Sequence, residues 1–430
     1  MAHYSHAKVL PADLSAPPMV KAWQARALVV AILFAVTAVV LAFVGGASGW
    51  DHLWRGYLVG LTLTWGFSCG GLLMLMLQYV TGGKWGLLLR RPFEAMSRTL
   101  WLIILYWLGL GLMLSRLYMW ANPGLVKEGV DKGLINTTQF NAIEHCLQWK
   151  HPMLNVGTYW VVGAICFAIW FFYTSRLNAM SLQRDKDTLA ATPYWIKKFE
   201  NLSGFGIVVY SLTMTALSIY WVMSTDVTWY SAVYGLLFLV GQAYQVLAFA
   251  IIVALALSKV EPFKTILRGV EQYDLGKFTF AFVMLNMYIA FGQFLIIWSG
   301  NLPEEINWYM DRINGHWGII CTIDFFLHWL IPFSLLLSRD LKSNKTRLTR
   351  VCQIMIVAKA FDLFWLVEPS YKDAARNLHF SWGILEYIAV PVAMTALWVA
   401  CFCWELQRRP VVQVNDPHLA EILEPEHAVA

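Results

Sequence analysis

Ten long apolar segments follow one another in this chain, joined by short connections. A bilayer core about 30 Å thick needs roughly 20 predominantly apolar residues in a helix, because every backbone N–H and C=O must find its partner inside the segment. The chain of 430 residues is 58% hydrophobic and only 14% charged. We therefore predict an all-α integral membrane protein with ten transmembrane helices. The predicted spans are residues 26–45, 55–80, 99–120, 154–175, 202–223, 231–257, 278–299, 316–338, 350–368 and 380–404.

Lysine and arginine are distributed unevenly between the connections. The connections after the second, fourth, sixth and eighth segments hold four to five of them each, whereas the others hold none to three. Because these residues are retained on the cytoplasmic side during insertion, both terminal segments, 1–25 and 405–430, are predicted to be cytoplasmic. The net charge of +5 then reflects this sidedness and contact with the lipid bilayer. No connection carries a dense basic run, so nucleic acid is not an expected partner.

Several classes of function lack their motifs. The seven cysteines form neither CxxC nor CxxCH, which excludes covalent c-type haem and an ordinary Cys-ligated iron–sulfur centre within this chain. Neither a Walker motif nor a GxGxxG fingerprint is present, so ATP-driven transport and nicotinamide binding lack support. The start of the chain does not match a signal peptide, and the acidic, Pro-containing stretch 408–430 is expected to be flexible.

Ionisable residues within the spans concentrate in the last three. Asp324 and His328 are four residues apart and share a helix face; Lys359 and Asp362 are three apart and do likewise. With Glu386, the two aspartates and the lysine lie roughly 9–14 Å below the predicted outer helix ends, at about 1.5 Å per residue. Since a charge at this depth is costly, these five residues are candidates for a proton path.

The structural alternatives stay open at this point. For Lys359 and Asp362 the alternative is a structural ion pair, in which the two charges neutralise each other and pin their helix to its neighbour. For His328 the alternative is a hydrogen-bonded packing residue. Haem b needs two histidines at matched depth, and only His328 lies near mid-membrane, so no haem is expected. No metal site is predicted either.

Three segments resemble a known family. They are MLQYVTGGKWG at residues 76–86, followed by Arg90 and Arg91; FGQFLIIWSGNLPEEINWYMDR at 291–312; and AKAFDLFWLVEP at 358–369. Together they resemble the quinone-binding membrane subunits of alternative complex III, a bacterial quinol:cytochrome c oxidoreductase. The similarity is greatest to the second of the two quinone-binding subunits, a relative of polysulfide-reductase and NrfD-type membrane proteins. Lys359 departs from the pattern, because another polar residue, often His, is expected at that position.

The resemblance implies an architecture and a set of partners. It implies an NrfD-like arrangement of two four-helix bundles, helices two to five (about 55–223) and six to nine (about 231–368), with helices one and ten outside. The chain would bind no redox cofactor of its own, support quinol oxidation and convey protons in the bacterial cytoplasmic (inner) membrane. The implied partners are a sister quinone-binding subunit, an iron–sulfur subunit with its clusters, and multihaem and monohaem cytochrome c subunits.

A quinone site, for quinone or menaquinone, needs an apolar slot and one or two polar groups. The first bundle offers Arg116, Glu144, His145 and His151 near the outer surface, in or beside the 121–153 connection, where residues 138–148 are expected to form a surface helix. The alternative is that these are ordinary surface residues. A second function, a secondary transporter of a small solute using the same buried charges, is less favoured because Pro332 and Pro391 are the only clear proline breaks inside spans and the internal repeat is faint.

Overall fold

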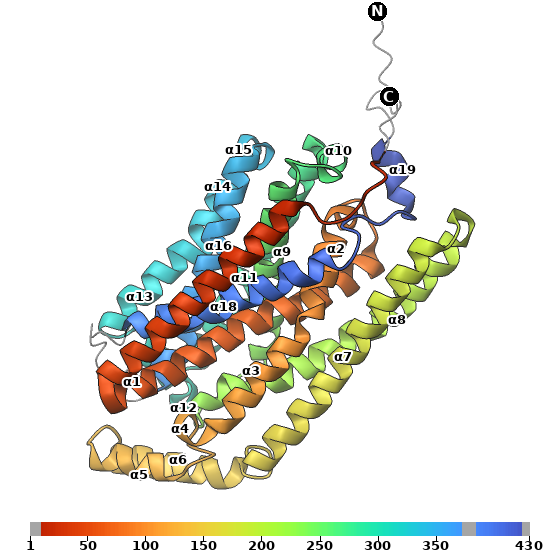
Figure 1. Ribbon diagram of the computed structural model, residues 1–430. Coiled ribbons are helices and arrows are strands. Elements are labelled where there is room, and N and C mark those ends of the chain that lie inside the picture. The colour runs from red at the N-terminus through yellow and green to blue at the C-terminus, as the bar shows by residue number, and fades with distance from the viewer. Residues whose placement is uncertain (1–9, 372–383, 424–430) are drawn as a thin grey trace, which may run out of the picture.

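The computed structural model describes residues 10–371 and 384–423. Within these ranges the chain forms helices and connecting turns and contains no strand (Figure 1). Eight helical stretches are long and apolar enough to cross a membrane. An all-α fold with membrane-spanning helices is thus as predicted, whereas the count of ten spans stays a prediction. The beginning of the tenth predicted span, residues 380–383, lies outside the described residues.

The longest helix, α1 (Pro18–Thr81), contains both the first and the second predicted spans. Its two limbs meet at Gly46, whose φ of 63° and ψ of −139° are rarely accessible to a residue with a Cβ. Figure 1 shows the chain reversing direction there, so that the limbs run side by side. α18 (Ile384–Gln407) packs along α1. One helix assignment therefore covers two predicted spans because a single glycine makes the turn.

The remaining long helices pack beside these two. α9 (Tyr234–Leu257) is the most buried of the apolar stretches and contacts α1, α8, α11 and α16. α16 (Lys345–Val367), the ninth predicted span, is absent from the eight apolar stretches, because it carries several Lys and Arg residues and one Asp. The other long elements are α2 (Trp85–Arg98), α3 (Leu100–Leu112), α7 (Val156–Lys186), α8 (Thr192–Trp221), α11 (Gly269–Gly300), α13 (His316–Asp324), η3 (Phe325–Leu330) and α14 (Ile331–Leu337).

Short helices close the two ends of the molecule (Figure 1). One end carries the start of α1 with α10 (Phe263–Ile266), α15 (Arg339–Ser343) and α19 (Pro417–Leu423); α10 and α15 belong to Lys/Arg-rich connections. The opposite end carries α4 (Leu114–Leu117), α5 (Gly124–Asp131), α6 (Thr137–Lys150) and α12 (Pro303–Ile313). The expected surface helix over 138–148 is confirmed as α6, which begins with a capping box between Asn136 and Gln139. The short 3₁₀ turns are η1 (Leu189–Ala191), η2 (Met223–Thr225) and η4 (Glu368–Ser370).

Two of the three family-like segments meet through Arg312. This residue is fully buried at the end of α12 and donates to the carbonyl of Leu366 and to the hydroxyl of Ser370, at 2.8 and 2.7 Å. Its guanidinium lies 3.7 Å from the ring centroid of Trp308. Nearby, Glu368 accepts a hydrogen bond from Arg55 of α1 at 3.0 Å. In this structure these residues join helix ends, which accounts for the polar residues at the ends of apolar segments.

The end of the chain folds back onto α2 and α7. Asp416 pairs with Arg90 at 2.6 Å, and Gln413 is bonded to both Arg90 and Arg184. Val411, like Gln413 and Asp416, is buried. The expectation of a flexible tail is therefore wrong for residues 408–423, because a buried polar network, invisible in the local composition, fixes it. Residues 424–430 lie outside the described chain.

Candidate functional site

Four of the five predicted proton-path residues lie together inside the protein. His328 Nδ1 lies 4.0 Å from Asp324 Oδ2 and 3.8 Å from Asp362 Oδ1. Lys359 Nζ donates to Asp362 Oδ2 at 2.7 Å. The four side chains are between 5% and 14% exposed. We call Asp324, His328, Lys359 and Asp362 the acid–histidine cluster; it joins residues that sequence spacing could place only on two separate helices.

The backbone around His328 is a π-helical turn, η3, between α13 and α14. Pro332 has no N–H to donate to the carbonyl of His328 four residues earlier, and its ring crowds that carbonyl. The hydroxyl of Tyr244 in α9 donates to it instead, at 3.1 Å, and the Tyr244 ring meets the imidazole edge-on with centroids 4.8 Å apart. Proline, the wider turn and Tyr244 together hold the imidazole toward the two carboxylates, and π-helical turns of this kind are frequent at functional sites.

Lys359 reaches the cluster because α9 leaves it room. A Cβ built on Gly241 would lie 2.8 Å from Lys359 Nζ, too close for any side chain at this position without displacing the ammonium. The ring centroid of Phe238, one turn earlier on α9, lies 5.9 Å from the same atom, within reach of a cation–π contact. The ammonium is therefore held between a carboxylate and an aromatic face.

The charges of the cluster favour one bound proton. With both carboxylates ionised and His328 neutral, two negative charges would face the single positive charge of Lys359. A buried net charge is strongly unfavourable, whereas one proton shared among Asp324, His328 and Asp362 makes the cluster neutral. One bound proton would therefore leave the cluster electrically neutral.

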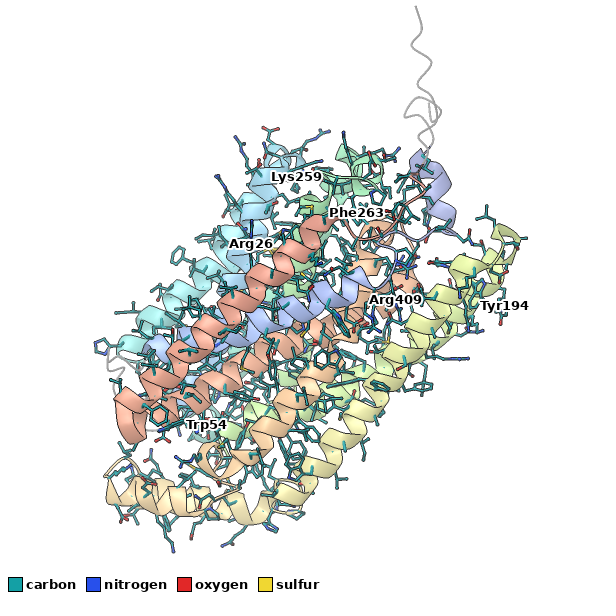
Figure 2. All side chains as sticks on the ribbon, viewed as in Figure 1. Arg26, Trp54, Tyr194, Lys259, Phe263 and Arg409 are labelled. Carbon is teal, nitrogen blue, oxygen red and sulfur yellow. The ribbon has the colours of Figure 1, made fainter. Side chains whose placement is uncertain are left out.

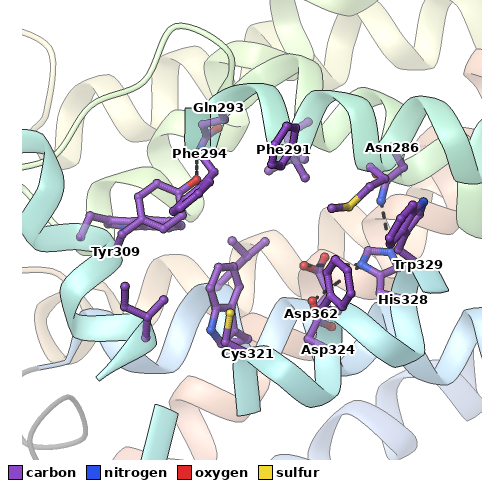
Figure 3. Close-up of a pocket in the computed structure, with 18 residues that line it drawn as sticks. Asn286, Phe291, Gln293, Phe294, Tyr309, Cys321, Asp324, His328, Trp329 and Asp362 are labelled. Atoms are coloured by element: carbon purple, nitrogen blue, oxygen red, sulfur yellow. Dashed lines mark hydrogen bonds and ion pairs between the residues drawn. The ribbon is translucent and has the colours of Figure 1, made fainter. Parts of the chain in front are cut away.

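A cavity of about 430 Å³ adjoins the cluster (Figure 3). Asp324, His328 and Asp362 lie at one end, and Phe294 and Tyr309 lie toward the other, as Figure 3 shows. The remaining walls, from α11, α12 and α16, are mainly apolar and aromatic. Its size and lining are typical of a pocket for a small amphipathic molecule.

Three buried polar atoms of residues lining the cavity have no hydrogen-bond partner in the described part of the chain. They are Asp324 Oδ1, Asn286 Oδ1 and Trp329 Nε1. The Asn286 amide nitrogen lies 3.4 Å from His328 Nε2, which links α11 to the cluster. Buried polar atoms are normally paired, so three unpartnered atoms among the lining residues are an unusual feature of this site.

Three residues of the acid–histidine cluster have the spacing of a cation site. Asp324, His328 and Asp362 each offer a ligand atom, and these atoms lie within 4.8 Å of one another. The ammonium of Lys359, however, already occupies Asp362 Oδ2 at 2.7 Å. A divalent cation would lie close to this fixed positive charge, so the donor set fits a proton better than a metal ion.

Glu386, the fifth predicted residue, lies apart in the first turn of α18. It is 1% exposed, and a Cβ on Gly45 of α1 would lie 3.9 Å from its Oε1. Within the described chain it forms neither an ion pair nor a hydrogen bond with the cluster. The depth count from the sequence could not give its direction around the helix.

Of the four quinone candidates, Arg116 lines a described cavity that Glu144, His145 and His151 do not line. Arg116, Glu144, His145 and His151 are all at least partly exposed. Arg116 lies 3.9 Å from Asp51 and lines a separate polar cavity of about 470 Å³ at the α4–α5 end. A quinone site at these residues stays a prediction, and the cavity beside the cluster is a second location that the sequence did not indicate.

Sequence reasoning also missed the partners of the cluster. Asn286 was detectable as an amide inside an otherwise apolar span, which is uncommon without a function or a partner. Tyr244, Gly241 and Trp329 gave no such signal, since aromatic residues and glycine are ordinary in spans. Comparison of the chain with protein-family models and with curated proteins gives no match. The family resemblance of the sequence therefore stays a prediction.

Proposed function

We propose that this chain is a proton-conducting membrane component of a quinol:electron-acceptor oxidoreductase, with no redox cofactor of its own. The observation that carries the proposal is the buried acid–histidine cluster beside an apolar cavity. His328 lies about equally far from two carboxylates, so that a small rotation of one side chain brings either within hydrogen-bond reach. This is the arrangement expected of a relay that takes a proton from one acid and passes it to another.

The proposal includes the membrane arrangement. The chain crosses the bacterial cytoplasmic membrane ten times, as two four-helix bundles with peripheral first and tenth helices, and both termini are cytoplasmic. The Lys/Arg-rich connections that contain α10 and α15 lie at the end where α1 begins and α19 is found, which supports this sidedness (Figure 1). The cluster belongs to the second bundle, which α9, α11, α13 to α14 and α16 would form.

The cavity supports a second element of the proposal, a place for the head group of a quinol. Its aromatic walls suit the ring, and Asp324, Asn286 and Trp329 add polar side chains to the lining that suit ring oxygens and hydroxyls. Phe291 and Phe325, at the wall, are 50% and 40% exposed, so the cavity borders the lipid-facing surface from which an isoprenoid quinol would enter. A proton released there would meet the cluster directly.

The proposed partners are a sister quinone-binding subunit, an iron–sulfur subunit and multihaem and monohaem cytochrome c subunits. The test is to tag the chain after Ala430, solubilise the native membrane mildly, and record mass spectra with a reduced-minus-oxidised optical spectrum. The proposal predicts a c-type haem signal with multihaem and iron–sulfur polypeptides. A colourless protein that purifies alone would contradict it and favour the alternative, a secondary transporter of a small solute.

A further inference from the structure

A second cavity, of about 590 Å³, lies at the end of the molecule where α10 and α15 are found. It is formed by the last turns of α9 and α18, the first turns of α16, and Trp23 of α1. Figure 2 labels Lys259, one of its lining residues, at this end. The cavity shares no residue with the cavity beside the acid–histidine cluster, so it is a separate feature.

The lining is divided into a cationic part and an apolar part. Lys259, Lys345 and Arg350 come from two segments of the chain, and all three are exposed. Phe249 and Phe402 lie deeper along α9 and α18, where the wall is apolar. An amphipathic molecule with an anionic head and a hydrocarbon tail matches this division.

The three cations have no carboxylate partner among the described residues. Lys345 Nζ donates to the hydroxyl of Ser258 at 3.1 Å and keeps two further N–H groups for a ligand. The described lining contains no Asp or Glu. Three positive charges therefore line one opening without internal neutralisation, and clustered Lys and Arg residues attract anionic lipids.

Another cavity has a similar number of cations, but a carboxylate of the chain neutralises them. It has about 570 Å³ and is lined by Arg98, Arg408 and Arg409, but also by Glu405. Glu405 lies 2.8 Å from Arg98 and 3.7 Å from Arg408, so its carboxylate already occupies the place of an external anion. The two cavities have similar volumes and the same number of cations. Only the cavity lined by Lys259, Lys345 and Arg350 leaves its positive charges for a ligand.

We infer that the cavity lined by Lys259, Lys345 and Arg350 binds one anionic phospholipid. The phosphodiester lies among the two ammonium groups and the guanidinium, and an acyl chain follows the apolar wall past Phe249 and Phe402. The site is independent of the proposed proton path, and its ligand comes from the bilayer rather than from the aqueous phase.

The test is native mass spectrometry of the purified full-length chain in detergent, titrated with phosphatidylglycerol. The wild-type protein should retain one phosphatidylglycerol at low lipid concentration and bind phosphatidylcholine at least about tenfold more weakly. The triple variant Lys259→Gln, Lys345→Gln, Arg350→Gln should lose this preference. The matched control Lys186→Gln, Lys197→Gln, Lys198→Gln removes three cations from around the α7–α8 connection and should bind as the wild type does.

A second variant guards against misfolding of the triple variant. Val399→Trp fills the apolar wall without changing charge, and it should also weaken phosphatidylglycerol binding. Equal binding by wild type and triple variant, or equal affinity for phosphatidylcholine, would overturn the inference. Displacement of the lipid by millimolar inorganic phosphate would likewise overturn it, because the site would then recognise a soluble anion alone.

Discussion

The strongest test of the geometry is a double-mutant cycle on Lys359 and Asp362, whose side chains are buried and joined at 2.7 Å. Removing one partner of a buried pair leaves an uncompensated charge and typically costs about 3–5 kcal/mol. Asp362→Leu should reach this range, because the ammonium would keep only the face of Phe238 beside it, and among the described residues no ion pair joins it to Asp324, the remaining acid. Lys359→Met should cost less, about 1–3 kcal/mol, since the remaining acids can take up a proton.

The double variant should be more stable than the sum of the two single effects predicts. Both charges are gone together, and replacing a buried pair by apolar residues of similar size is often close to neutral. We expect a coupling free energy of at least about 3 kcal/mol, measured by chemical unfolding in detergent micelles and followed by tryptophan fluorescence. Lys277→Met is the control partner, because Lys277 is exposed and pairs with Asp274; its effect should add to that of Asp362→Leu.

Additive effects of Lys359→Met and Asp362→Leu would refute the reasoning, because two charges in direct contact cannot be energetically independent. The cycle also separates structure from function. If the pair served only to hold α16 in place, the stable double variant would conduct protons normally. The proposed relay predicts a stable protein that has lost conduction.

Three further outcomes follow from single positions. Gly46→Ala should lower the free energy of unfolding by about 1–3 kcal/mol through its positive φ alone, while the neighbouring control Gly45→Ala should have little effect, as thermal unfolding would show. Gly241→Ala should displace the Lys359 ammonium and reduce proton conduction without removing any titratable group, which a vesicle proton-flux assay checks. Burial acts to raise the pKa of Asp416, but its arginine neighbours, chiefly Arg90, outweigh it and hold the pKa below 3.8. Tail docking should therefore be complete at neutral pH and weaken only as the pH falls below about 4, and Asp416→Asn should abolish this dependence in the anisotropy of a dye attached after the last residue.

The sequence was sufficient for the all-helical class and for locating the buried acids Asp362 and Glu386, but not for Glu94, Glu405 or Asp416, which are also buried. Span length and apolar content follow from bilayer thickness, so the helical segments could be located without tertiary information. Residues three or four apart share a helix face, so the sequence alone could pair Asp324 with His328 and Lys359 with Asp362. These inferences depend only on distances along one helix.

What depends on contacts between helices could not be predicted. The rotation of one helix against another decides that Asp362 faces His328 while Glu386 faces α1, and an apolar span gives no sign of that rotation. The cavity exists because side chains from several helices leave a space, and no local pattern encodes it. The docked tail likewise depends on Arg90 and Arg184, which are far from Asp416 in the chain.

The most direct test of the central proposal is the number of protons translocated per electron by the purified assembly in sealed vesicles. Wild type is compared with Asp362→Asn and with Asp274→Asn, an exposed acid outside the cluster. The proposed relay predicts that Asp362→Asn assembles normally and translocates fewer protons per electron, whereas Asp274→Asn behaves as the wild type. An unchanged stoichiometry in Asp362→Asn would contradict the proposal and reduce the cluster to a structural ion pair.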